Sequence, residues 1–67
     1  MSDRTNFENM EPTAHIQTQD RSGNWITTST TINKSTYILS AMRQAKTLFG
    51  DARIRAVDSR GRVLDIL

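Results

Sequence analysis

Few side chains in this chain could perform chemistry, and their spacing does not combine them into a catalytic or metal-binding group. There is one histidine, His15, and no cysteine, so a disulfide scaffold and a Cys-based zinc site are excluded. His15 is predicted to lie across a hairpin from Ser29, and such a pair on a solvated sheet is typical of surface residues rather than of a nucleophile and its base. Asp58 and Asp65 are each predicted to face an arginine, which leaves no carboxylate pair for hydrolysis. We therefore expect no enzymatic activity, metal ion, organic cofactor or small-molecule substrate.

Basic residues dominate the stretch from residue 43 to residue 62, where six basic side chains meet two acidic ones and give a local charge of +4. Such a stretch could attract phosphates or an acidic protein surface. The basic side chains with no predicted acidic partner are Arg43, Lys46, Arg53 and Arg60. Together with Trp25 they define an alternative function, nucleic-acid binding on a stacking platform. This alternative is disfavoured because the sequence has a single tryptophan and contains neither an RNP-type motif nor a Gly-rich phosphate loop.

Two hairpins are predicted to position these side chains. Residues 14–19 alternate in polarity, a turn follows at Asp20–Gly23, and residues 24–31 are rich in β-branched types. A three-residue loop closed by Gly23 sets Gln19 opposite Trp25. Counted onward, this register sets Ile16 opposite Thr28, so that Ile16 and Ile26 share one face and Trp25 lies on the other.

The second hairpin repeats the same turn spacing, Asp-x-x-Gly, between strands 53–58 and 62–67. The same geometry sets Asp58 opposite Arg62 and Val57 opposite Val63. It also pairs Ala56 with Leu64, Arg55 with Asp65 and Ile54 with Ile66. The charge pattern and the apolar pattern agree in this register, which favours it.

A helix is predicted over residues 34–49, with Asn33 as its N-cap and Gly50 ending it. Its apolar stripe consists of Ile38, Ala41, Met42, Ala45, Leu48 and Phe49. The expected fold is α+β, ββαββ, with one helix packed on one face of a four-stranded, mostly antiparallel sheet of undetermined strand order. Residues 1–12 are predicted to be a flexible tail, and 13–67 a single small domain. Among the core residues, Leu48 and Ile54 are expected to cost most when truncated.

The sheet face opposite the helix is predicted to carry an uncovered apolar patch, flanked by arginines. The members of this predicted surface are Trp25, Val57, Val63, Leu67, Arg53 and Arg55. Patches of this kind usually meet a partner, and small domains without disulfides often gain stability by association. The sequence therefore predicts a protein-interaction module that binds a second copy of itself or another protein.

No apolar run exceeds three residues, so we expect no membrane segment and no signal peptide, and a cytoplasmic location. The layout of residues 52–58, followed by 61–67, is similar to that of short bacterial accessory proteins of uncharacterised role, some of them carried by prophages. The resemblance extends over residues 14–67 and is one of style. It implies a stoichiometric binder that modulates a host or phage factor, and it brings no catalytic residue.

Overall fold

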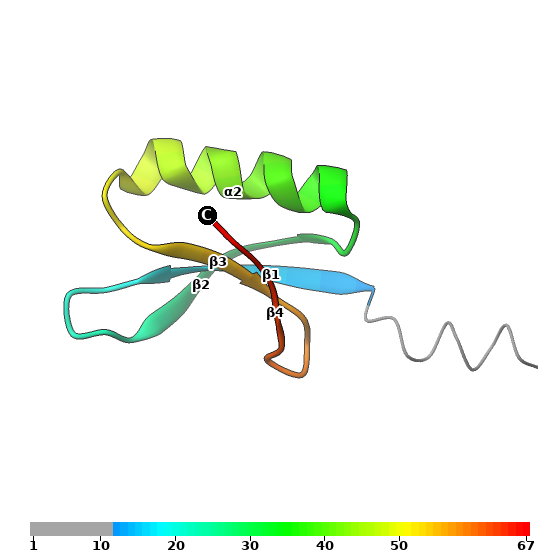
Figure 1. Ribbon diagram of the computed structural model, residues 1–67, viewed down its shortest axis with the longest axis horizontal. Helices are drawn as coiled ribbons and strands as arrows, with labels where there is room; N and C mark the ends of the chain where they lie inside the picture. The colour runs from blue at the N-terminus through cyan, green and yellow to red at the C-terminus, as the bar shows by residue number, and fades with distance from the viewer. Residues whose placement is uncertain (1–11) are drawn as a thin grey trace, which may run out of the picture.

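The computed structural model describes residues 12–67, and the predicted tail falls outside this part apart from Pro12. The elements are, in chain order, β1 (Thr13–Gln19), β2 (Trp25–Ile32), α2 (Ser35–Phe49), β3 (Ile54–Val57) and β4 (Val63–Ile66). The four strands form one antiparallel sheet, and α2 lies over one of its faces (Figure 1). The predicted ββαββ α+β fold is confirmed.

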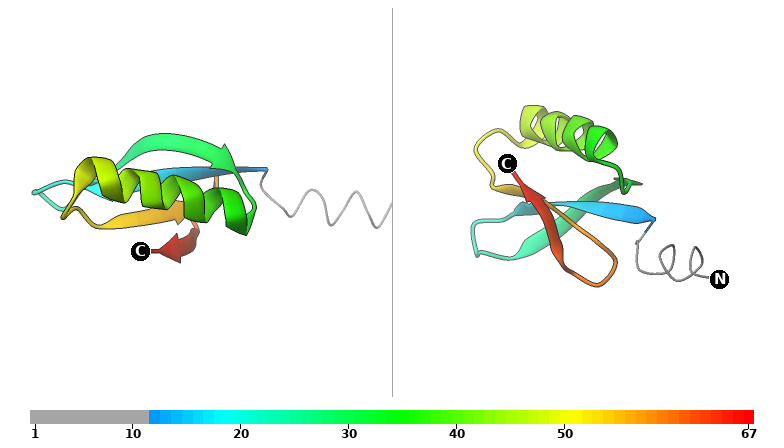
Figure 2. Two further views of the ribbon diagram at one scale, coloured as in Figure 1. Left: turned by 90° about the horizontal axis from the view of Figure 1, so that it is seen from above. Right: turned by 45° about the vertical axis from the view of Figure 1, so that its right-hand side comes forward.

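The strand order, which the sequence left open, is β2-β1-β3-β4. The first strand therefore lies inside the sheet and pairs with β2 on one side and with β3 on the other, while β2 and β4 form the two edges. The helix packs on β1, β2 and β3. Viewed from above, α2 lies over these strands and β4 lies to one side (Figure 2).

A β-bulge at Thr28 interrupts the first hairpin. The predicted pairs next to the turn, Gln19 with Trp25 and Thr18 with Ile26, are confirmed. Beyond the bulge Ile16 pairs with Ser29, so the predicted Ile16–Thr28 pair is wrong. The predicted facing of His15 and Ser29 is wrong for the same reason, since His15 pairs with Thr30. The Thr28 hydroxyl donates a hydrogen bond of 3.3 Å to the Ile16 carbonyl.

The second hairpin contains a bulge as well, at Leu64. Val57 pairs with Val63 as predicted, but Ala56 then pairs with Asp65 and Arg55 with Ile66. The predicted Arg55–Asp65 and Ala56–Leu64 pairs are therefore wrong. The extra residue in β4 moves every later side chain to the other face of the sheet.

The core lies between α2 and the two inner strands. Its buried apolar residues are Ala14, Ile16, Ile38, Met42, Ala45, Ile54 and Ala56. Ile26 and Ile66, predicted to lie on the covered face, are 49% and 67% exposed, because both belong to edge strands and the bulge turns Ile66 away from the helix.

Leu48 was predicted to lie in the core but is 70% exposed. At 3.6 residues per turn, Leu48 lies about 120° around the helix from Met42, which is only 1% exposed. The last turn of the apolar stripe therefore lies outside the buried side of α2. Phe49, in the same turn, is also 44% exposed.

The two helix ends differ in how well they match the sequence pattern. The N-cap is Lys34, in an extended conformation and without a side-chain capping bond, so the prediction of Asn33 as N-cap is wrong. Gly50 ends the helix as predicted, with φ of 60° and its N–H donating to the Lys46 carbonyl at 2.9 Å. Glycine tolerates this left-handed backbone, which L side chains avoid.

Candidate functional site

The sheet face that α2 leaves uncovered, called here the open face, is organised around Trp25. The guanidinium carbon of Arg55 lies 4.1 Å from the centre of the Trp25 ring, within the range of a cation–π contact. The Arg55 Nε donates to Gln17 Oε1 at 2.8 Å, and Gln17 Nε2 donates to Thr27 Oγ1 at 3.2 Å. Side chains from three adjacent strands thus fix the position of the half-buried indole ring.

The apolar part of the open face lies on β4. Val63 and Ile66 pair with Val57 and Arg55, so they share the face of the Trp25–Arg55 stack. Both are exposed, by 48% and 67%. This arrangement gives the open face a hydrophobic edge beside its fixed aromatic ring.

Two residues predicted for this patch do not belong to it as exposed groups. Val57 is only 3% exposed, and it lies on the inner strand β3 between its partners His15 and Val63. Leu67 follows Ile66 and donates its backbone N–H to the Ile54 carbonyl, which places it beside a core residue rather than beside Trp25. Because of the bulge at Leu64, Ile66 and not Leu67 lies on the open face.

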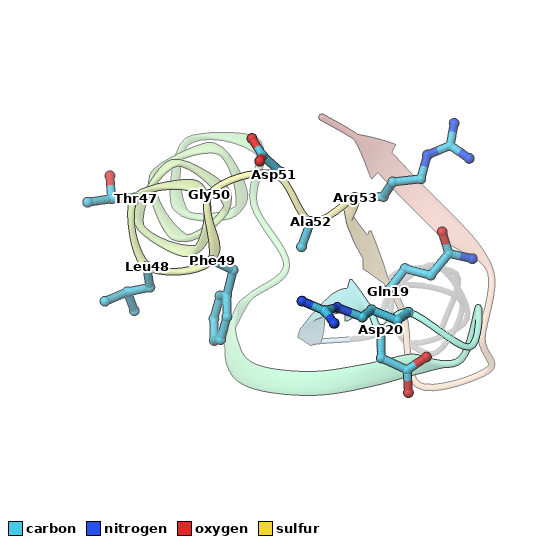
Figure 3. A pocket seen from close by; sticks show the side chains of 10 residues that line it. Gln19, Asp20, Thr47, Leu48, Phe49, Gly50, Asp51, Ala52 and Arg53 are labelled. Carbon is cyan, nitrogen blue, oxygen red and sulfur yellow. The ribbon is translucent and has the colours of Figure 1, made fainter.

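A groove of about 830 Å³ opens where the helix end approaches the first hairpin turn (Figure 3). Phe49 points into the space between α2 and the hairpin, whereas Arg53 is directed away from the helix. Two arginines, Arg21 and Arg53, and two acids, Asp20 and Asp51, balance the charge of its lining. Carbonyl groups at a helix C-terminus favour cations, so this groove has no preference for an anion.

Asp58 is the most enclosed acid of the described part of the chain, at 3% exposure. Its Oδ1 accepts from the backbone N–H groups of Arg60 and Arg62, and its Oδ2 forms a 2.8 Å ion pair with Arg62 Nε. Removal from water raises the pKa of Asp58, but these hydrogen bonds and the Arg62 charge outweigh that effect and lower the pKa overall. Both oxygens stabilise the turn, so this carboxylate is committed to structure.

The basic residues of the nucleic-acid alternative are not brought together. Arg43 and Lys46 lie on α2, while Arg53 precedes β3 and Arg60 lies in the turn that follows it, at the other end of that strand. The face of Trp25 on which a base could stack is occupied by Arg55. The open face therefore lacks a continuous basic track.

Residues 12–67 contain no group of three or more His, Cys, Asp or Glu side chains placed to hold a metal ion. None of the helical segments described has the length and apolar character needed to cross a membrane. His15 lies between Thr30 and Val57 on the open face.

Sequence reasoning missed two members of the open face, Gln17 as a bridging residue and Ile66 as an exposed one. The alternation around Gln17 placed it on the correct face, but its link to Arg55 depends on β1 and β3 being neighbours. Comparisons of the chain with protein-family models, curated proteins and solved structures gave no match.

Proposed function

We propose that this chain is a non-enzymatic protein-binding module of the cytoplasm that docks another protein on its open face. The observation that carries the proposal is the exposed pair Val63 and Ile66 beside the Trp25–Arg55 stack. A rigid aromatic ring flanked by apolar side chains is the usual composition of the energetic centre of a protein interface.

The charge of the open face defines the chemistry of the partner. Arg55 lies on this face, and Arg53, two residues earlier, lies on the same side just before β3 begins. Of the acids on or next to β3 and β4, Asp65 pairs with Ala56 of the covered face and Asp58 is engaged by Arg62, so neither places a free carboxylate beside Arg55. The proposed partner therefore presents an apolar surface with acidic residues at its rim.

An affinity experiment with matched variants tests the proposal. The wild-type chain serves as bait in an extract of its native host, and the captured protein is purified and its affinity measured by calorimetry. We expect Ile66→Lys to weaken binding at least tenfold, or about 1.4 kcal/mol. Leu39→Lys, on the helix at the opposite side of the sheet, should leave affinity unchanged. Equal affinities for the two variants would exclude the open face as the docking surface.

A second arm separates protein binding from nucleic-acid binding. Binding of a homopolymeric single-stranded DNA should be undetectable, and the affinity for the protein partner should change little between about 50 mM and about 200 mM salt. Nucleic-acid binding would instead weaken steeply over this range, because each phosphate contact releases counterions. Salt-sensitive DNA capture that Arg53→Ala reduces more than Ile66→Lys would overturn the proposal in favour of the basic residues.

A further inference from the structure

The two edges of the sheet differ in how well they are protected against pairing with another strand. The edge strand β4 has four residues, one of them Asp65, and Arg62 immediately precedes it. The other edge, β2, has eight residues, WITTSTTI, with no charge and no proline. Natural sheets usually protect long edges with charges, prolines or short strands. Of these devices β2 has none, and its single irregularity is the bulge at Thr28.

Hydrogen bonds at the two ends of β2 show which backbone groups face solvent. The Asn24 carbonyl accepts from Asp20 N–H at 2.9 Å, and Asn33 N–H donates to the Pro12 carbonyl at 3.0 Å, so both residues turn toward the β1 side. Alternation along an antiparallel strand then directs four residues away from β1. These outward residues are Trp25, Thr27, Thr30 and Ile32.

The bulge at Thr28 makes this outward set symmetric about the middle of the strand. In a regular strand Trp25 and Ile32, seven residues apart, would lie on opposite faces of the sheet. The extra residue shifts the alternation of side chains by one position. Trp25 and Thr27 therefore share the open face with Thr30 and Ile32. These last two residues pair with His15 and Thr13. A bulge normally makes an edge strand less able to pair. This bulge instead places the outward-facing residues of both halves of β2 on the same face of the sheet.

We infer that β2 pairs antiparallel with β2 of a second copy of this chain, about a two-fold axis perpendicular to the sheet. Full overlap sets Trp25 opposite Ile32 of the second copy and Thr27 opposite Thr30 of the second copy. Aromatic–β-branched and Thr–Thr pairs are among the stabilising cross-strand pairs. All these residues lie on one face and point their backbone groups across the new interface.

The surface next to β2 on the helix side supports a second copy as the occupant. A groove of about 100 Å³ runs between the middle of β2 and α2, and its lining residues are Thr28, Ser29, Ala41, Gln44, Ala45, Leu48 and Phe49. None of them is charged, in a chain with 24% charged residues. A two-fold axis through the middle of β2 brings the residues next to the axis near their own copies, so a charge at this position would meet a like charge. The uncharged flank and the exposed Leu48 fit self-pairing.

The inference goes beyond the proposed function and does not rest on it. A two-fold axis perpendicular to the sheet keeps both helices on one side and both open faces on the other. The dimer would therefore form one eight-stranded sheet and leave Val63 and Ile66 free in each copy.

Sedimentation equilibrium of the full chain tests the inference. We expect the wild type to have twice the 7.6 kDa chain mass. The double variant Thr27→Lys, Thr30→Lys sets lysines opposite lysines and should sediment as a monomer. The matched double variant Thr27→Glu, Thr30→Lys sets glutamate opposite lysine and should restore the dimer. Ile66→Lys should remain dimeric, so loss of partner binding and loss of self-association are distinguishable.

A wild type that stays monomeric at millimolar concentration would overturn the inference. So would a monomeric Glu–Lys variant with native circular dichroism, because it would contradict the pairing register. If the lysine variant does not fold, Thr30→Pro replaces it as the test. The Thr30 N–H points away from β1, so its removal should block pairing with a second copy without unfolding the monomer. We expect a folded monomer, and a folded dimer would refute the pairing.

Discussion

The contact between Arg55 and Trp25 gives the open face its most specific side-chain arrangement, because Gln17 fixes the guanidinium and the guanidinium covers the indole ring. Arg55→Ala should uncover the ring and cost about 0.5–1 kcal/mol of unfolding free energy. The emission of Trp25, the single tryptophan, should shift to longer wavelength as its exposure rises. Arg53→Ala is the control and should leave the spectrum unchanged. Identical spectra for both variants would show that the stack does not persist in solution.

Asp58 confers an acid dependence on stability. Its pKa is lowered in the fold, so its contribution is present above the ordinary carboxyl pKa of about 3.9 and is lost as pH falls through the lower folded value. We expect Asp58→Asn to lower stability at neutral pH and to flatten the loss of stability on acidification. Thermal melts between pH 2 and pH 7 measure this, in steps of about one pH unit. Asp51→Asn, at an exposed acid, should keep the wild-type profile, and an unchanged profile for Asp58→Asn would contradict the assignment.

At the scale of the elements, helix α2 is held by few residues. Met42 is 1% exposed over the inner strands, so Met42→Ala should leave a cavity and cost about 2–5 kcal/mol. Leu48→Ala, in the same helix, should cost less than about 0.5 kcal/mol, because the side chain is 70% exposed. Urea denaturation at low protein concentration, where self-association does not contribute, compares the two. Equal costs would mean that Leu48 packs in the core after all.

The sequence located all five elements, both turns and the helix end, because polarity alternation, Asp-x-x-Gly and Gly50 are local signals. It could not locate the bulges. Residues 27–31 are all threonine or serine, which fit either face, so no apolar residue marks the slip at Thr28. In β4 nearly every residue is apolar, so the sequence gives no sign whether Ile66 or Leu67 lies on the covered face, with or without the bulge.

The candidate site was affected by these same limits. Trp25 and Val63 were assigned correctly to the open face because they precede the bulges as counted from each turn, and Arg55 because the second bulge lies in β4 and leaves the alternation of β3 intact. The Gln17–Arg55 contact joins residues 38 apart and depends on strand order, which local patterns do not encode. Exposure at the helix end also escaped prediction, because periodicity shows which residues share a side of a helix but not how far the sheet extends beneath it.

At the scale of the whole molecule, the chain has 67 residues, and the apolar core cluster of its described part, residues 12–67, has seven, so we expect little stability in reserve. If β2 pairs with a second copy, association adds to unfolding free energy by mass action. We expect the melting temperature of the wild type to rise with protein concentration, and that of Thr30→Pro to be independent of it. Calorimetry at two concentrations tests this, and a constant wild-type melting temperature would argue against the dimer.

The position of β4 at an edge that the helix does not cover has a consequence for the motions of the sheet. All four of its residues are exposed, and it pairs only with β3. Local opening of β4 therefore exposes little apolar surface, whereas opening of β1 breaks two strand pairings and the core at once. Amide hydrogens of residues 63–67 should exchange with deuterium well before those of residues 14–18. The strand that carries Val63 and Ile66 thus alternates more readily between a paired and a detached state than the inner strand β1.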